Sequence, residues 1–94
     1  MERTLAFATV NKIGKKIKLA GWVNSIRDHG KITFIDLRDR SGIIQCVGED
    51  LSKVTSESVI EVVGKVNARP ENMINPKIET GKVEVQIEKL EVVT

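Results

Sequence analysis

Residues 27–45 read RDHGKITFIDLRDRSGIIQ, and this stretch decides the fold because strand-like segments alternate in it with turns. Ile32 to Arg38 alternates apolar and polar side chains with the period of two that is typical of a β-strand. Asp28 to Lys31 precedes it as a tight turn with a glycine, and Asp39 to Gly42 follows it as a second turn. Ile43 to Val47 then begins another strand. The stretch therefore predicts strands that meander in succession.

Strand patterns extend outward from this stretch in both directions. Apolar and polar side chains alternate before the first turn, and strand character returns twice in the second half of the chain. Gly64 interrupts one of the later segments and predicts a bulge or a sharp bend. Residues 70–81 contain both prolines and several turn formers, so we expect a surface loop there. The predicted strands are residues 16–27, 31–38, 42–48, 58–69 and 82–93.

Residues 49–56 lose the alternation and predict a short helix. Asp50 can cap its N-terminus, and Leu51 and Val54 would share one face. Three meandering strands, a small helix and two more strands match the element order of an all-β OB-fold, a five-stranded Greek-key barrel. A small SH3-like barrel is the alternative, and a helix between strands 3 and 4 favours the OB-fold. We expect a single domain over residues 1–94.

The composition limits the class of protein. The 94 residues suit one domain that folds without metal or disulfide bonds. Cys46 is the only cysteine, so no intrachain disulfide can form, and a reducing compartment is expected. No stretch has the length and apolar character of a transmembrane helix, and the N-terminus lacks the pattern of a signal or transit peptide. The sequence predicts a soluble, cytoplasmic protein with no membrane partner.

Charge is unevenly distributed along the chain. The net charge is +2, but residues 1–47 carry nine Lys and Arg against four Asp and Glu, whereas residues 48–94 carry six against nine. A field with this asymmetry can orient a polyanion on the N-terminal half. Ordinary scatter of surface charge explains the same pattern equally well.

Three residues of the opening stretch suit single-stranded nucleic acid. Arg27 can contact a phosphate or a base edge, Phe34 offers a flat face for stacking, and Gln45 has a donor and an acceptor for a Watson–Crick edge. Simpler interpretations exist, because Phe34 could be a core residue and Gln45 an ordinary exposed strand residue. Their combination predicts a binding face on strands 2 and 3.

The sequence shows no catalytic or metal-binding constellation. One histidine, one cysteine and no tyrosine cannot supply a His/Cys metal cluster. Gly14-Lys15-Lys16 lacks the spacing of a phosphate-binding loop. We expect no catalytic residue, no metal and no cofactor in this chain.

Several motifs of the chain occur together in one known family. They are Gly21-Trp22-Val23-Asn24, Arg27-Asp28-His29-Gly30, Phe34-Ile35-Asp36-Leu37-Arg38-Asp39-Arg40, Gly42-Ile43-Ile44-Gln45, Arg69-Pro70, Ile74-Asn75-Pro76, Thr80-Gly81 and Val83-Glu84-Val85. Over essentially its whole length the sequence resembles the N-terminal anticodon-binding domain of bacterial-type aspartyl-tRNA synthetases, which are class II enzymes. Related lysyl- and asparaginyl-tRNA synthetases share the fold and the phenylalanine, but the Arg-Asp-His-Gly turn joined to Leu-Arg-Asp-Arg-Ser-Gly resembles the aspartyl enzymes.

The resemblance implies that the chain grips the anticodon loop of aspartate tRNA. In such domains the residue at Phe34 stacks on the middle base, a uridine, and those at Gln45 and Arg27 bond base edges or nearby backbone. Glu84 matches a family position that helps to read the first anticodon base. Its carboxylate can accept the N1 and N2 hydrogens of guanine.

The chain departs from the family pattern around the same residues. Ser25 and Ile26 stand where many members have arginines, Asn67 stands where a second arginine is common, and Lys82 replaces a usual glutamate. Asn67 and Arg69 complete the set that the resemblance implies for nucleic-acid binding. The departures imply fewer phosphate contacts.

The resemblance also bears on tRNA choice and on the parent enzyme. A histidine is often found at the position of His29 in bacterial members that accept both aspartate and asparagine tRNAs, so we predict relaxed discrimination of the third anticodon base. The parent enzyme would be a homodimer that uses ATP, magnesium and aspartate in a catalytic domain outside this chain. The chain by itself would be a monomer that does not aminoacylate tRNA.

Two other functions are compatible with the residues. A generic single-stranded nucleic-acid binder would use the same face without reading bases, and its affinity would depend steeply on salt. A protein-interaction or dimerisation module would make nucleic acid irrelevant. Loss of Phe34 would then change self-association instead of RNA binding.

Overall fold

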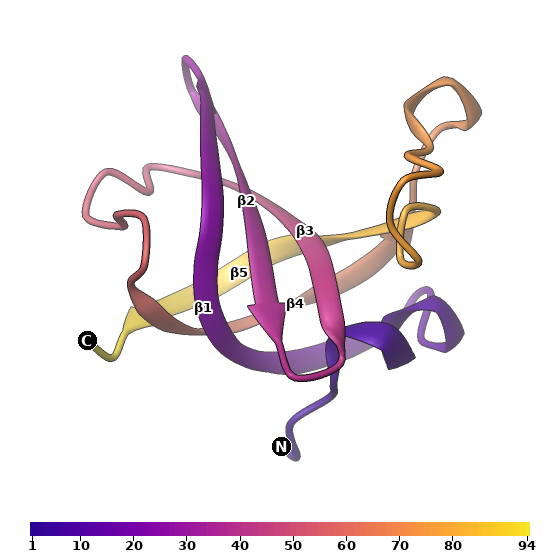
Figure 1. Ribbon diagram of the computed structural model, residues 1–94, viewed down its shortest axis with the longest axis horizontal. Helices are drawn as coiled ribbons and strands as arrows, with labels where there is room; N and C mark the ends of the chain where they lie inside the picture. The colour runs from indigo at the N-terminus through magenta and orange to yellow at the C-terminus, as the bar shows by residue number, and fades with distance from the viewer.

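A computed structural model describes residues 1–94. Five strands close into one barrel in the order β1-β2-β3-β5-β4 (Figure 1). Neighbouring strands are antiparallel except β3 and β5, which run parallel. This closed order confirms the predicted OB-fold over the SH3-like alternative. The strands are β1 (Lys16–His29), β2 (Ile32–Asp39), β3 (Gly42–Glu49), β4 (Val59–Ala68) and β5 (Val83–Val92).

Inward-facing side chains of the strands fill the barrel. Phe34 lies between two buried residues of β2, Thr33 and Ile35, and is itself only half-buried. Because successive side chains of a strand point to opposite faces, Phe34 lies on the outer face, and the alternative of a core Phe34 is wrong. Cys46 is fully buried, and burial raises the pKa of its thiol. The buried apolar core comprises Ala6, Ile17, Leu19, Val23, Ile35, Leu37, Ile44, Cys46, Val54, Ile60, Val62, Val66, Val83 and Val85.

The long strand β1 pairs with two different strands along its length. Its first half pairs with β4 and its second half with β2, and its register with β2 shifts between Val23 and Ser25. This irregularity bends the strand around the barrel. The β1–β2 hairpin turns at Gly30, whose φ is +78°, and its tip rises beyond the barrel (Figure 1). β1 thus continues through His29, beyond the predicted end at Arg27.

The helix predicted at residues 49–56 is wrong, because β3 and β4 are connected by two turns. Asp50 has a φ of +54°, a conformation that neither a helix nor its N-cap adopts. The backbone N–H of Thr55 donates to the Ser58 hydroxyl, so a side chain takes a bond that a helix would make with its backbone. Leu51 and Val54 do share a face, since Val54 is buried and Leu51 packs against the core. Their spacing predicted the packing correctly and the backbone wrongly.

No sequence pattern predicted the two short 3-10 helices, η1 (Ala6–Asn11) and η2 (Glu71–Met73). η1 is fixed from a distance, because the carboxylate of Asp39 accepts the backbone N–H of Ala6 at 2.8 Å. The same carboxylate accepts the hydroxyl of Ser41 at 2.6 Å. Asp39 thereby ties the N-terminal segment to the turn between β2 and β3. η2 lies within the predicted loop between β4 and β5, which projects from the barrel (Figure 1).

Gly64 forms the bulge that the sequence predicts. The register of β4 with β5 shifts between Val63 and Gly64. A Cβ at Gly64 would lie 2.2 Å from the carbonyl oxygen of Gln86 and 2.8 Å from Cγ1 of Val85. Only glycine lets the two strands approach this closely at this point.

Candidate nucleic-acid interface

Outward-facing side chains from all five strands form one continuous surface. The strand registers place Arg27 opposite Phe34, Asp36 opposite Gln45, and Asn67 opposite Glu84. Residues opposite each other in a sheet have their side chains on the same face, and a hydrogen bond between Gln45 and Glu84 joins the two halves of the surface. We call this surface the reading face, and its members are Arg27, Phe34, Asp36, Gln45, Asn67 and Glu84. Sequence and resemblance predicted five of these six.

A chain of hydrogen bonds crosses four strands of the reading face. Asp36 accepts hydrogen bonds from both terminal nitrogens of Arg27. The distance is 2.9 Å from Nη1 to Oδ2 and 3.1 Å from Nη2 to Oδ1. The same Nη2 donates to Gln45 Oε1 at 2.9 Å, and Gln45 Nε2 donates to Glu84 Oε1 at 2.9 Å. Ser25 donates its hydroxyl to Asp36 Oδ2 at 2.9 Å. Three predicted site residues, Arg27, Gln45 and Glu84, are therefore connected directly.

These contacts hold the Gln45 amide in one orientation. Its oxygen faces a guanidinium, which can only donate, and its nitrogen faces a carboxylate, which can only accept. Turning the amide over would place its NH₂ group against Arg27 and its oxygen against Glu84, and both hydrogen bonds would be lost. The second lone pair of the oxygen and the second N–H make no hydrogen bond within the chain, and Gln45 is 9% exposed.

Asp36 and Arg27 form a charged pair. Burial by itself raises the pKa of Asp36, but hydrogen bonds from Arg27 and Ser25 and the positive charges of Arg27 and Arg69 outweigh it, so this pKa lies below its ordinary value. The hydrogen bond to Asp36 is the main reason why the pKa of Arg27 is raised. Both groups are therefore charged at neutral pH.

Asp36→Asn is expected to destabilise the chain at neutral pH, and the effect should shrink in acid. Because the pKa of Asp36 is lower in the folded chain than its value of about 3.9 in an unfolded one, its stabilisation is complete above that value. The stabilisation is lost as the pH falls through the folded-state pKa. Urea unfolding of the wild-type chain and the variant between pH 7 and pH 3 measures the difference. A difference in unfolding free energy that persists undiminished at pH 3 would contradict the charged pair.

Arg69 lies beside the reading face with only 8% of its surface exposed. Its Nε donates to the carbonyl oxygen of Val83 at 2.9 Å, and its Nη1 donates to that of Met73 at 3.4 Å. Its Nη2 is buried and has no hydrogen-bond partner. Burial lowers the pKa of Arg69, while the charges of Glu84 and Asp36 oppose this shift. The guanidinium thus places positive charge near both carboxylates and retains a free donor.

Phe34 and His29 form an aromatic pair at the hairpin end of the reading face. Their ring centroids are 5.4 Å apart and their planes meet at 86°, an edge-to-face arrangement. Phe34 also lies opposite Val47 of β3. His29 is exposed at the end of β1. All seven predicted site residues therefore lie on the reading face or beside it.

Asp36 is the member of the reading face that the sequence analysis did not single out. The alternating charges from Asp36 to Arg40 predict ordinary surface pairs that act as scaffold. A usable signal lies in its position, because Asp36 follows Phe34 by one period of the strand and therefore shares its face. Its partner on the neighbouring strand β3 is Gln45.

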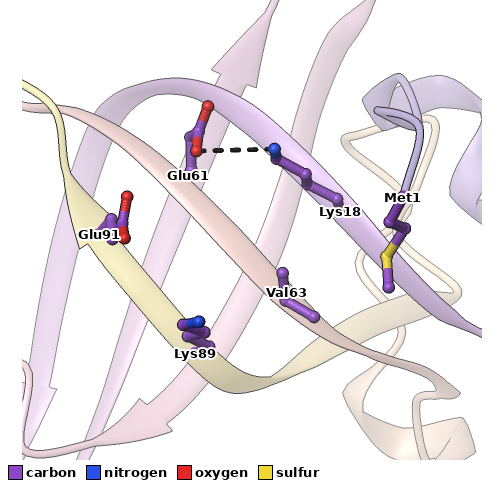
Figure 2. A pocket seen from close by; sticks show the side chains of 6 residues that line it. All are labelled: Met1, Lys18, Glu61, Val63, Lys89 and Glu91. Atoms are coloured by element: carbon purple, nitrogen blue, oxygen red, sulfur yellow. Dashed lines mark ion pairs between the residues drawn. The ribbon is translucent and has the colours of Figure 1, made fainter.

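A hollow of about 380 Å³, shown in Figure 2, contains none of the predicted site residues. In it Lys18 points toward Glu61, with 3.7 Å between Nζ and Oε1. Lys89 and Glu91 add further charges of both signs. This mixture gives no preference for a polyanion, so the hollow does not compete with the reading face as a nucleic-acid site.

No group of three or more His, Cys, Asp or Glu side chains is arranged so that it could hold a metal ion. None of the helices has the length and apolar character needed to span a membrane.

Comparison with known proteins identifies sequence relatives. The family model for the OB-fold nucleic acid binding domain, named for the tRNA anticodon, matches residues 17–93. The aspartate–tRNA(Asp/Asn) ligase of Brachyspira hyodysenteriae is 50% identical over 92 residues, which cover 88% of the chain and 16% of the ligase. The aspartate–tRNA ligase of Macrococcus caseolyticus is 50% identical over 94 residues, which cover 90% of the chain and 16% of the ligase. The chain thus spans only a small part of the curated relatives that it matches.

Solved structures agree with this result. The asparaginyl-tRNA synthetase of Pyrococcus horikoshii, complexed with asparaginyl-adenylate, has a TM-score of 0.81 and 31% identity, and the match covers 100% of this chain and 23% of that one. The aspartyl-tRNA synthetase of Entamoeba histolytica has a TM-score of 0.89 over 100% of this chain and 21% of that one, and at 19% identity it shows the fold alone. The chain therefore belongs to the family of OB-fold nucleic-acid-binding domains and is homologous to the anticodon-binding domain of aspartate–tRNA ligases.

Proposed function

We propose that the reading face recognises the anticodon loop of aspartate tRNA and so positions this tRNA for aminoacylation by a ligase of which the chain is one domain. The observation that carries the proposal is the hydrogen-bonded series Arg27, Gln45 and Glu84 beside the outward ring of Phe34. This arrangement combines a stacking surface with directed donors and acceptors, as base-specific recognition of single-stranded RNA requires. The similarity to the aspartate–tRNA ligases of Brachyspira hyodysenteriae and Macrococcus caseolyticus supports aspartate tRNA as the partner.

Phe34 and Gln45 are suited to a uridine at the middle position. The ring offers a stacking surface on the outer face of β2, and such stacking contributes about 1–3 kcal/mol per base. The free lone pair of Gln45 Oε1 can accept the N3–H of uracil, and the free N–H of Nε2 can donate to a uracil carbonyl. Because stacking tolerates any base, discrimination has to come from these hydrogen bonds.

Glu84 is suited to a guanine at the first position. Its Oε1 accepts one hydrogen bond from Gln45, and Oε2 and the remaining lone pairs are free for the N1 and N2 hydrogens of guanine. Asn67, opposite Glu84 on β4, extends the same surface.

His29 supports a broader choice that includes asparagine tRNA. Aspartate and asparagine tRNAs differ in the third anticodon base, and His29 forms an edge-to-face pair with Phe34 at the end of β1. Several relatives that are 47–52% identical carry the name aspartate–tRNA(Asp/Asn) ligase. We expect a stem-loop with uridine in the third position to bind the chain as well as one with cytidine does. A clear preference for cytidine would restrict the proposal to aspartate tRNA.

The remaining functions of the parent enzyme belong to residues outside this chain. The chain contains no side-chain cluster suited to Mg²⁺, and ATP, Mg²⁺ and aspartate would act in the catalytic part of a cytoplasmic, homodimeric ligase. By itself the chain would be a monomer that binds tRNA without charging it. Its contribution to the reaction is positional, because a fixed anticodon loop orients the distant acceptor end.

The test is binding of the chain to an anticodon stem-loop of aspartate tRNA and to a copy whose middle uridine is replaced by adenosine. Fluorescence anisotropy at near-physiological salt gives both dissociation constants. We expect the native loop to bind roughly ten-fold or more tightly, because a well-placed pair of base-edge hydrogen bonds discriminates by about 1–3 kcal/mol. Equal binding with a steep salt dependence would instead indicate a generic single-stranded nucleic-acid binder. Absence of binding together with self-association would indicate a protein-interaction module.

A further inference from the structure

Asp36 is a member of the reading face whose oxygens are already occupied. Oδ2 accepts hydrogen bonds from Ser25 and from Nη1 of Arg27, and Oδ1 accepts one from Nη2 of Arg27. Its side chain is 22% exposed. With three of its roughly four lone pairs engaged, the carboxylate is placed to act on a ligand mainly through Arg27.

Arg27 in turn uses its terminal nitrogens within the chain. Nη1 donates to Asp36 and Ser25, and Nη2 donates to Asp36 and Gln45. Each terminal nitrogen has two N–H groups, so all four are engaged. The bidentate contact with Asp36 therefore sets the direction in which Nη2 meets the Gln45 oxygen.

We propose that Asp36 is a positioning residue that makes the chain distinguish uridine from cytidine at the middle anticodon base. Asp36 fixes Arg27, Arg27 fixes the amide oxygen of Gln45 on one side, and Glu84 holds the amide nitrogen on the other. The proposal rests on the proposed function, because it requires that Gln45 meets that base.

The chemistry of the two bases explains why a fixed amide discriminates. Uracil presents a donor at N3 and an acceptor at C4, whereas cytosine presents an acceptor at N3 and a donor at C4. An amide that can turn over matches either base, because its oxygen and its NH₂ group exchange places. An amide held between Arg27 and Glu84 presents its oxygen and its NH₂ group in one fixed order. For a base stacked in one pose on Phe34, that order pairs with the donor and acceptor pattern of one of the two bases only. Without Asp36, Arg27 loses its fixed direction, and Glu84 alone then opposes the reversed orientation of the amide.

The experiment compares binding of two stem-loops that differ only in uridine or cytidine at the middle position. The wild-type chain should prefer uridine, and in Asp36→Ala the ratio of the two dissociation constants should fall roughly ten-fold toward unity. Asp36→Asn, which keeps the shape of the side chain, should lower the ratio in the same direction and carries the comparison if Asp36→Ala fails to fold. Glu61→Gln is the matched control, because it also removes one negative charge but lies outside the reading face, paired with Lys18. It should leave the ratio unchanged.

A second measurement needs no RNA. Hydrogen exchange of the Gln45 side-chain amide, followed by NMR in the free chain, should be faster in Asp36→Ala than in the wild type because the amide is no longer held.

These measurements test the positioning role of Asp36 and the proposed function separately. A ratio that stays at the wild-type value in the Asp36 variants, or an equal loss of affinity for both loops, would overturn the positioning role. If the wild-type chain binds neither loop, the proposed function fails, and the role of Asp36 fails with it. If the wild-type chain binds the uridine and cytidine loops equally but rejects the adenosine loop, the proposed function stands and only the role of Asp36 in discrimination is overturned. Slow amide exchange that persists in Asp36→Ala would also overturn the proposal, whatever the RNA results.

Discussion

Phe34→Ala should weaken binding of the aspartate-tRNA anticodon stem-loop by roughly 5- to 150-fold, which corresponds to the 1–3 kcal/mol that stacking of one base contributes. The ring lies on the outer face of β2, between the buried residues Thr33 and Ile35, so its removal leaves the core intact. In the free chain, its cross-strand neighbours Arg27 and Val47 and its aromatic partner His29 lose contact with the ring. Stability should therefore fall by about 1 kcal/mol or less.

Anisotropy titrations and urea unfolding of the same preparations separate these two effects. Phe7→Ala is a closely matched control, because Phe7 is the other phenylalanine of the chain, is 53% exposed and lies on η1, outside the reading face. It should leave RNA binding unchanged. Undiminished affinity in Phe34→Ala would mean that the stacked base, if any, lies elsewhere on the molecule. A change in self-association instead would favour the interaction module.

Gly64→Ala should destabilise the barrel by about 3 kcal/mol, at the upper end of the usual cost of overpacking. The added methyl carbon would lie 2.2 Å from the Gln86 carbonyl oxygen, and backbone of the adjacent strand cannot move away as the end of a flexible side chain can. β4 and β5 would have to separate where their register already shifts. For a domain of this size the expected fall in Tm is roughly 12–24 °C.

Thermal unfolding followed by circular dichroism measures this loss. Gly30→Ala provides the comparison, because a Cβ there meets nothing within 4 Å and only the positive φ of +78° opposes it. That substitution should cost about 1–2 kcal/mol. If Gly64→Ala unfolded at the temperature of the wild-type chain, the close approach of β4 and β5 would be wrong.

Local patterns were sufficient for the strands, whereas the outward direction of Phe34 was predicted only through the family resemblance. Alternation with a period of two is imposed by strand geometry alone, so it can be recognised without knowing what the strand packs against. The position of Gly64 in such a segment likewise indicated a bulge. The strands and the bulge depend on neighbours along the chain.

The contacts of the reading face depend on residues far apart in sequence. Arg27 and Gln45 are separated by 18 positions, and Gln45 and Glu84 by 39. No local pattern specifies which strands become neighbours when a barrel closes. Glu84 was therefore predicted only through the family resemblance, and Asp36 was assigned to the scaffold.

The errors in secondary structure have a similar origin. The positive φ of Asp50 and the hydrogen bond from Thr55 to Ser58 replaced the expected helix with turns. η1 depends on the carboxylate of Asp39, which accepts a hydrogen bond from the backbone N–H of Ala6, 33 positions away in the sequence. Short segments with weak intrinsic preference take the conformation that distant side chains stabilise.

The parallel pairing of β3 with β5 closes the barrel through few residues, and we expect it to form late in folding. Only two residue pairs are in register there, Cys46 with Val85 and Val47 with Gln86. Joining strands so distant in sequence costs loop-closure entropy, so we expect this seam to form after the β1–β2–β3 meander. The hydrogen bond between Gln45 and Glu84 crosses the same seam. An RNA base bound to both residues would stabilise the closed barrel by mass action, so that occupancy by RNA and completion of the fold become one coupled equilibrium.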